Sequence, residues 1–358
     1  MNRFLLFFCS FLFSTSASAD SLSTYIVNGS DASVSTYSEF ASLFYDARSY
    51  TGYYGTSAYC GATFLTDQYV MTAAHCLFEE DSSSLDEEYL LFTVIGQTDD
   101  ESDFPYSLTT VRASEYYYPD GYTNDSSTLW QNDIAIIKLE SSVSGSQTHA
   151  NIVTDESYRD TSYSFTAVGH GITQTGEVSS SVTQLQSTGM TYVTQTNCVT
   201  SDSSLNDVSS SQICFTGDNV DTATSSDLIN GVCSGDSGGP VYWTDSSLGY
   251  LVQVGVTSFG PSTCGQGTGT SKITAVFTEV GDYNTWIQNV ISGSVTAKFV
   301  ATDAKRAAFA ASYGSLYYSG SSSSSTVTTT SSSGGSIGGQ GLLVLALLYV
   351  IRRWFNNR

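Results

Sequence analysis

The sequence predicts an all-β fold, arranged as a sandwich or a barrel, with one helix near its end. Strand-like segments alternate with loops rich in Gly, Ser and Asp from residue 26 to about residue 280. Tyr (24) and Gly (31) are abundant while Pro (4) is scarce, a composition that favours strands and turns over long helices. Many short strands separated by turn signals are typical of sandwiches and barrels.

The individual elements are predicted from apolar patterns. The clearest strands are expected at residues 90–95, 134–139, 164–168 and 251–256. A helix is expected at residues 283–291, where apolar side chains recur at helical spacing. The alanine-rich residues 297–311 could form a further helix. Residues 320–333 are almost entirely Ser and Thr, a composition typical of a flexible linker.

The start of the chain has the pattern of a secretory signal. Arg3 provides the positive charge, residues 4–13 are apolar, and residues 17–19 read ASA, an A-x-A cleavage site. The apolar stretch is too short for a retained membrane helix. We therefore expect signal peptidase to remove residues 1–19 and to leave residues 20–25 as a short polar peptide.

The chain is strongly acidic, with a formal net charge of −22. Residues 1–19 and 342–358 contain four of the 12 basic residues and no acidic residue. The remainder therefore carries 34 acidic and eight basic residues, a net charge of −26. Such a surface argues against binding to nucleic acid or to an anionic membrane. Two explanations stay open, namely solubility in salty surroundings and attraction of basic substrates.

Six cysteines remain once Cys9 leaves with the signal. An even number in an exported chain indicates disulfide bonds, and six cysteines allow 15 pairings. No two cysteines have C-x-x-C spacing, so a structural zinc site is not expected.

Three segments contain the residue types of a nucleophile, a base and an orienting acid: MTAAHC at residues 71–76, NDIA at 132–135 and CSGDSGGP at 233–240. A Ser hydroxyl is a weak nucleophile until an imidazole takes its proton. A buried carboxylate fixes the imidazole tautomer and stabilises the cation that forms. Glycines beside the Ser allow backbone N–H groups to hold a developing oxyanion. The three segments together are far more specific than any one of them.

This set of motifs resembles the trypsin/chymotrypsin family of serine endopeptidases, over residues 26–291 or about three-quarters of the chain. The resemblance implies two six-stranded antiparallel β-barrels with the active site in the cleft between them. It implies His75 as general base, Asp133 as the acid that orients it and Ser237 as nucleophile. Gly235 and Ser237 would form the oxyanion hole. Substrates would be proteins or peptides, and no cofactor is expected.

The family also implies three disulfides and an activation step. The pairs would be Cys60 with Cys76, Cys198 with Cys214, and Cys233 with Cys264. Residues 26–29 read IVNG, and in this family proteolysis frees an Ile ammonium that inserts beside the Asp preceding the nucleophile. Here Ile26 and Asp236 would be the pair, residues 20–25 the activation peptide, and the activator another protease or the enzyme itself.

The expected specificity departs from that of trypsin. Trypsin-like members place an Asp six residues before the nucleophile, where this chain has Gly231. Asp227 lies four residues earlier and is expected outside the pocket. The pocket walls would include Ser258, Gly260 and Ala275. Without a carboxylate at its floor, the pocket should accept an uncharged, apolar side chain, although the segment from residue 264 to 276 is longer than usual and could reshape it.

Two further departures concern single positions. The family's Gly-Trp-Gly segment appears here as Gly-His-Gly at residues 169–171, so His170 is expected to have a structural role. The acidic residues Asp99, Asp100, Glu101 and Asp103 lie near where some relatives bind calcium. Oxygen ligands suit Ca²⁺, but the spacing does not clearly match, so a solvated loop and a calcium site both stay open.

Residues 334–358 contain a GGSIG segment, an apolar run at 342–351, and arginines at the end. This order resembles the GlyGly-CTERM sorting signal of Gram-negative bacteria, which a rhomboid-type protease cuts near the glycines. It implies transient anchoring in the membrane, export through the periplasm, and final attachment to the cell surface or release. The alternative is a simple membrane anchor with Arg352 and Arg353 on the cytoplasmic side.

The expected domains are therefore residues 1–19 (signal), 20–25 (activation peptide), 26–292 (protease), 293–333 (an unassigned segment and linker) and 334–358 (sorting tail). The alternative to a protease is an inactive homologue that acts as a surface binding protein. Loss of a catalytic residue would indicate that class, and none of the three is missing.

Overall fold

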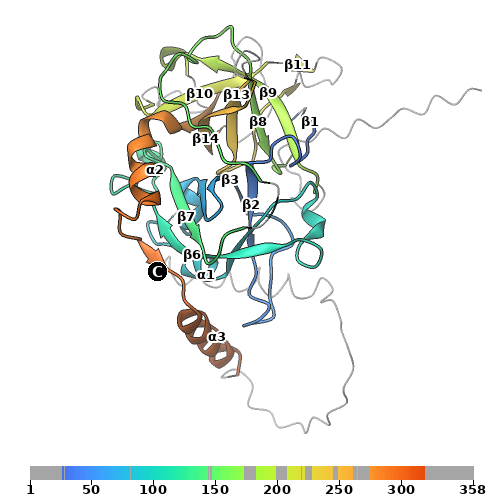
Figure 1. Ribbon diagram of the computed structural model, residues 1–358, viewed down its shortest axis with the longest axis vertical. Helices are drawn as coiled ribbons and strands as arrows, with labels where there is room; N and C mark the ends of the chain where they lie inside the picture. The colour runs from blue at the N-terminus through green and yellow to red at the C-terminus, as the bar shows by residue number, and fades with distance from the viewer. Residues whose placement is uncertain are drawn as a thin grey trace, which may run out of the picture. The chain divides into compact units, whose positions relative to one another are not determined.

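The computed structural model describes residues 26–27, 29–80, 82–143, 145, 147–172, 183–198, 208–218, 220–221, 228–244, 249–260, 264 and 274–318. The expected signal, activation peptide, Ser/Thr linker and sorting tail all lie outside these residues. Two closed six-stranded antiparallel β-barrels form the protein, as predicted (Figure 1). Both belong to one compact unit that runs to Gly314, past residue 292.

The first barrel, barrel 1, closes in the order β2-β3-β4-β7-β6-β5, with β5 returning to β2. A short seventh strand, β16, pairs with β6. The core is apolar and includes Leu43, Phe64, Ile136 and Ile137. The strands are β2 (Phe40–Tyr45), β3 (Cys60–Thr66), β4 (Tyr69–Thr72), β5 (Thr93–Gly96), β6 (Thr110–Tyr117), β7 (Ala135–Leu139) and β16 (Phe299–Val300).

The second barrel, barrel 2, closes in the order β8-β9-β10-β15-β14-β13, with β13 returning to β8, and β1 adds to β9. Strand β9 alternates buried and half-buried residues, as expected for a strand with one face on a core. The strands are β1 (Ser30–Asp31), β8 (Phe165–Gly169), β9 (Gln186–Val193), β10 (Gln212–Gly217), β13 (Pro240–Trp243), β14 (Val252–Phe259) and β15 (Ala275–Glu279); β11 (Val220–Asp221) and β12 (Leu228–Ile229) pair as a separate two-stranded sheet.

The α-helices are few in the described part of the chain. They are α1 (Glu87–Phe92), α2 (Asn284–Ile291) and α3 (Asp303–Tyr318). Helix α2 is the helix predicted at 283–291, and α3 begins later than the alanine-rich segment because residues 299–300 form β16. Single 3-10 turns are η1 (Ala74–Leu77), η2 (Glu101–Asp103), η3 (Ser126–Thr128), η5 (Gln195–Asn197) and η6 (Val280–Tyr283).

The strand predicted at residues 90–95 is wrong over its first half. Residues 90–92 belong to α1, and the strand β5 begins only at Thr93. The Asp86 side chain accepts a hydrogen bond from the Tyr89 N–H, and Glu87 and Glu88 occupy the first turn. An N-cap carboxylate and acidic residues near a helix N-terminus stabilise the helix, and these local contacts outweigh the apolar run that follows them.

Three disulfides connect the described cysteines, with the pairs that the family resemblance implies. They join Cys60 to Cys76, Cys198 to Cys214, and Cys233 to Cys264. The first attaches η1, which contains Cys76, to the start of β3, and the third attaches the segment before Ser237 to Cys264. None of the helices in the described residues is both long and apolar enough to cross a membrane.

Candidate active site

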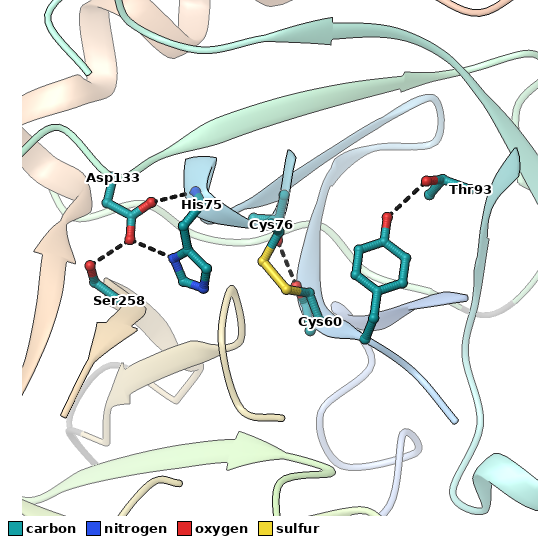
Figure 2. The surroundings of a disulfide bond; sticks show 9 residues. Cys60, His75, Cys76, Thr93, Asp133 and Ser258 are labelled. Carbon is teal, nitrogen blue, oxygen red and sulfur yellow. Dashed lines mark hydrogen bonds and ion pairs between the residues drawn. A yellow bond between two sulfur atoms is a disulfide. The ribbon is translucent and has the colours of Figure 1, made fainter. Parts of the chain in front are cut away.

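His75 and Asp133 come together on barrel 1. His75 lies in η1, directly after β4, and Asp133 lies just before β7, the strand that pairs with β4. The His75 ring Nδ1 is 2.8 Å from Asp133 Oδ2, and the His75 backbone N–H donates to Oδ1 at 2.8 Å. Figure 2 shows the Asp133 carboxylate between two partners, with His75 on one side and Ser258 on the other. Asp133 thus fixes both the position and the orientation of the imidazole.

Barrel 2 holds Asp133 in place. The Ser258 hydroxyl of β14 donates to Asp133 Oδ2 at 2.5 Å, and Thr278 of β15 donates to the Asp133 backbone carbonyl at 2.7 Å. Tyr283 donates to the side chain of the neighbouring Asn132 at 2.8 Å. Asp133 is fully buried. Hydrogen bonds to its carboxylate offset the loss of water, and the contacts to its backbone and to Asn132 fix its position. The site therefore depends on contact between the two barrels.

The pKa of His75 is raised above its ordinary value. Burial favours the neutral ring and acts against the shift, but the charge of Asp133 and its hydrogen bond to the ring overcome it. A raised pKa makes the imidazole a stronger proton acceptor. His75 keeps 24% of its side chain exposed, so the ring remains accessible on one side.

Ser237 lies in a tight turn whose backbone requires glycine. Gly235 and Gly238 have φ values of +100° and +78°, a region that other residues rarely adopt. A Cβ on Gly238 would lie 2.1 Å from Thr72 Oγ1. In the described part of the chain, the N–H groups of Gly235 and Ser237 have no hydrogen-bond acceptor, whereas those of Asp236, Gly238 and Gly239 do. The turn therefore presents the two free donors that an oxyanion hole needs.

The nucleophile turn is attached to barrel 1 through its backbone. The N–H of Gly61 donates to the Ser237 carbonyl at 2.8 Å, and Gly61 follows Cys60, which is bonded to Cys76 beside His75. Among the described side chains, no hydrogen bond joins the Ser237 hydroxyl to His75. Such contacts are often long before substrate binds.

Asp236 is buried in a cradle of backbone. Its carboxylate accepts hydrogen bonds from the N–H groups of Gly171 and Cys233, both at 2.8 Å. A Cβ at Gly169 would lie 2.2 Å from Asp236 Oδ1, and one at Gly171 would lie 2.4 Å from Asp236 Cγ, so both positions require glycine. Burial raises the pKa of Asp236 to about 7, partly opposed by these hydrogen bonds. Within the described residues of this uncleaved chain, Asp236 has no cationic partner.

Ile26 is fully buried although it follows the expected activation peptide. Its φ is +32°, an unfavourable conformation for a β-branched residue. The next residue, Val27, forms an isolated bridge with Gly231, whose N–H donates to the Val27 carbonyl at 3.1 Å. This bridge places the expected new N-terminus beside the segment that leads to the nucleophile turn.

Gly231 is the expected floor of the specificity pocket. Among the described residues, a Cβ added to Gly231 would meet no atom within 4 Å, while one on Gly260 would lie 3.7 Å from the Ala275 Cβ. The hydroxyl of Ser258 is committed to Asp133, so Ser258 can contribute only its backbone to substrate binding. Asp227 and residues 265–273 lie outside the described residues.

His170 and the acidic residues at positions 99–103 form hydrogen bonds within the protein. The His170 Nδ1 lies 3.3 Å from Ser42 Oγ, and burial lowers the pKa of the ring to about 4. Glu101 is 2% exposed and accepts a hydrogen bond from the Ala58 N–H, which contradicts a solvated loop at this position. Asp99 accepts from the Val34 N–H and Asp103 from the Thr98 hydroxyl. Each of these carboxylates has a protein donor.

Two groups of residues in the described structure have ligand atoms close enough for a metal ion. One comprises Cys60, His75 and Cys76, whose sulfurs are joined in a disulfide. The other comprises Glu156, Glu279 and Asp282. Arg159 donates to Glu279 at 2.9 Å and contacts Glu156 at 3.1 Å. A guanidinium therefore already pairs with two of the three carboxylates of the second group.

The sequence predicted His75, Asp133 and Ser237 as catalytic residues but did not predict the residues that contact the segment around Asp133. Thr278 was not singled out, Tyr283 was noted only as the start of a predicted helix, and Ser258 was assigned to the pocket wall. No local signal distinguishes a hydroxyl that will reach Asp133, because each contact spans more than 100 residues of sequence.

Two closed antiparallel barrels with this site between them define a serine endopeptidase, a hydrolase of the trypsin/chymotrypsin type. The chain belongs to the trypsin family, because the sequence model of that family, described as "Trypsin", matches residues 26–287.

Individual relatives agree with this assignment. Trypsin delta of Drosophila erecta is 31% identical over 229 residues, which cover 64% of this chain and 77% of the relative. Chymotrypsin-C of Rattus norvegicus is 30% identical over 275 residues, 75% of this chain and 90% of the relative. Among solved structures, neuropsin, a serine protease expressed in the limbic system of mouse brain, is similar with a TM-score of 0.55. That similarity covers 74% of this chain and 100% of neuropsin at 19% identity, and so concerns the fold.

Proposed function

We propose that the chain is a secreted endopeptidase in which Ser237 attacks the carbonyl carbon of a peptide bond. The observation that carries the proposal is the pairing of His75 with a buried Asp133, close to a turn that presents two free N–H groups. His75 Nε2 takes the Ser237 proton as the Oγ–C bond forms, and Asp133 stabilises the resulting imidazolium. The N–H groups of Gly235 and Ser237 bind the oxyanion.

The remaining steps use the same groups. The imidazolium gives its proton to the departing amine when the C–N bond breaks, which leaves an acyl group on Ser237. A water molecule then attacks the acyl carbon while His75 takes a proton from it. Expulsion of the Ser237 oxygen, which recovers its proton from His75, releases the new carboxyl end and restores the site.

A fluorophosphonate probe tests this assignment, because it forms a covalent bond only with an activated serine. The protein without residues 1–25 should be labelled once, at Ser237, and mass spectrometry of the labelled peptide would show the site. His75→Ala should abolish labelling, whereas substitution of the exposed surface residue His149 by Ala should not. A folded protein that stays unlabelled would instead support an inactive homologue that acts as a surface binding protein.

We also propose that the protein is made as a precursor and activated by cleavage before Ile26. The new ammonium would pair with Asp236, whose burial without a cation is unfavourable in the uncleaved chain. Cleavage would also remove the constraint on φ at Ile26, a strain of about 1–3 kcal/mol. The residue before the cut is Tyr25, so the activator needs an aromatic preference. The enzyme itself, acting on a second copy, is our first candidate.

The pocket should prefer apolar or aromatic side chains over Lys and Arg. Two observations support this preference. The described residues leave space beside Gly231, an uncharged residue, and the expected pocket wall contains the small side chain of Ala275. A peptide-library profile of the mature enzyme should therefore show aromatic and large apolar residues before the cleaved bond. Gly231→Asp should raise cleavage after Lys and Arg relative to Phe, since it adds a carboxylate to this space. A wild-type profile dominated by Arg and Lys would contradict the prediction.

The cellular route is proposed from the chain ends. All six cysteines of the mature chain form disulfides, which is typical of an oxidising compartment, and this agrees with removal of residues 1–19 by signal peptidase. We propose that residues 334–358 anchor the protein transiently until a rhomboid-type protease cuts near the glycines. The enzyme would then reside at the cell surface or outside the cell.

A further inference from the structure

The chain continues past α2 as a segment that lies against barrel 1. We call residues 294–312 the strap; they lie beyond the residues that match the trypsin family. The strap contains β16, the orange strand beside β6 in Figure 1, and the first turns of α3, the darker helix below it. Strand β16 pairs antiparallel to β6, with Phe299 opposite Tyr116 and Val300 opposite Glu115.

The strap binds where β6 has an open edge. Strand β5 pairs with β6 only from Thr110 to Arg112, because the chain before Thr93 is the helix α1. Beyond Arg112 the strap supplies the missing donors, with the N–H of Ala301 donating to the Ser114 carbonyl and that of Lys298 to the Tyr116 carbonyl, both at 2.8 Å. Unpaired backbone groups at a sheet edge are unfavourable when buried and promote aggregation when exposed.

Arg306 attaches the strap to three segments, namely α1, β6 and the residue that follows β7. Its Nε donates to the Leu91 carbonyl at 2.6 Å and its Nη2 to the Ala113 carbonyl at 2.8 Å. Its Nη1 donates to Glu140 at 2.6 Å. Leu91 lies in the last turn of α1, where carbonyls lack helical partners. The Arg306 side chain is 1% exposed, and a guanidinium is buried favourably only when its donors are paired in this way.

Apolar contacts add to these hydrogen bonds. The Phe309 ring lies 5.5 Å from that of Phe92, and the Phe299 ring lies 6.0 Å from that of Tyr116. Ala301 is 5% exposed. Phe92 ends α1 and Tyr116 belongs to β6, so the strap packs against the same two elements that its polar groups bind.

We propose that the strap is an obligatory part of the catalytic unit, which completes barrel 1 and is locked by Arg306. Barrel 1 carries His75 and Asp133, so a stable active site requires the chain as far as about residue 312. The chain beyond this point is dispensable for folding. Removal of the tail therefore leaves the enzyme intact, whereas loss of the strap destroys it.

Single substitutions in the full chain test the role of the Arg306 hydrogen bonds. Arg306→Met should lower the unfolding temperature by roughly 10 °C, because it leaves two buried carbonyls without their donor and leaves Glu140 with Arg112 at 3.4 Å as its remaining cation. The matched control is Lys305→Met, which removes the same charge from the adjacent, exposed position. Lys305 donates to Val300 within the strap and stacks on Phe299, so its loss should lower the unfolding temperature by only about 2 °C.

Truncation provides a second measurement. A chain that ends after residue 314 should match the full chain in unfolding temperature, and a chain that ends after residue 292 should unfold at a much lower temperature or fail to fold. If Arg306→Met prevents folding while Lys305→Met does not, the proposal is supported. Equal unfolding temperatures for the chains ending at 292 and 314, or for Arg306→Met and Lys305→Met, would overturn it. These readouts do not depend on catalysis, so they remain informative even if the proposed mechanism fails.

Discussion

Ser237→Ala should reduce kcat/KM for peptide hydrolysis by about 10⁴-fold or more. The substitution removes the nucleophile, and triad deletions in enzymes of this class have effects of that size. The protein should remain folded, because among the described residues the Ser237 contacts to barrel 1 involve its backbone. The measurement is steady-state hydrolysis of an apolar peptide substrate by the mature protein, with the unfolding temperature recorded alongside.

Ser234→Ala is the matched control. Ser234 is exposed and lies in the same turn, where its carbonyl accepts a hydrogen bond from the Ile172 N–H, a contact that the substitution retains. Its activity should stay close to that of the unmodified protein. Substantial hydrolysis by a clean preparation of Ser237→Ala would show that another residue acts as nucleophile.

Cleavage before Ile26 should increase kcat/KM by about 10²-fold or more, because the new ammonium would pair with Asp236 and hold in place the turn whose N–H groups bind the oxyanion. Tyr25→Arg would allow trypsin to make the cut at the desired bond, and N-terminal sequencing would verify a chain that begins at Ile26. The same precursor with Asp236→Asn should be cut normally but gain little activity, since the new ammonium then has no carboxylate to bind. A precursor as active as the cut enzyme would refute the activation step.

The pH dependence of stability gives an independent measure of the same ion pair. In the uncleaved chain burial raises the pKa of Asp236 to about 7, so the folded state holds a proton that the unfolded state releases above about pH 4. This group therefore lowers precursor stability as the pH rises from 4 to 7. The ammonium of the cut chain should depress the pKa of Asp236 below its unfolded value, which removes this loss of stability between pH 4 and 7. The cut chain should gain in unfolding temperature over the precursor across this interval.

Self-activation can be separated from activation by another protease. A Ser237→Ala precursor should remain uncut on its own and should be converted by a trace of mature enzyme, which the expected aromatic preference would direct to Tyr25. Normal maturation of this inactive precursor in its native host would show that a different protease suffices.

The sequence by itself determined the family and the catalytic candidates, because these depend on short strings whose residue types are dictated by chemistry. The disulfide pairs followed from the resemblance to that family, since six cysteines alone allow 15 pairings. His75, Asp133 and Ser237 each lie in a motif that specifies its own local backbone. Gly235 and Gly238 could be interpreted in the same way, since only glycine readily adopts their positive φ. The C-terminal helix at 284–291 was predictable because its apolar residues follow a helical period.

Only the tertiary structure decided how these pieces support one another. Ser258, Thr278 and Tyr283 hold the segment around Asp133 from distant strands and turns, and no local pattern announces a contact of that range. The strap was equally hidden, because Arg306 among alanines resembles an exposed helical residue. Its burial follows from the early end of the β5–β6 pairing, where the chain before β5 forms α1. Three carbonyls of β6 and one of α1 then need hydrogen-bond donors, and the strap supplies them from almost 200 residues later in the chain.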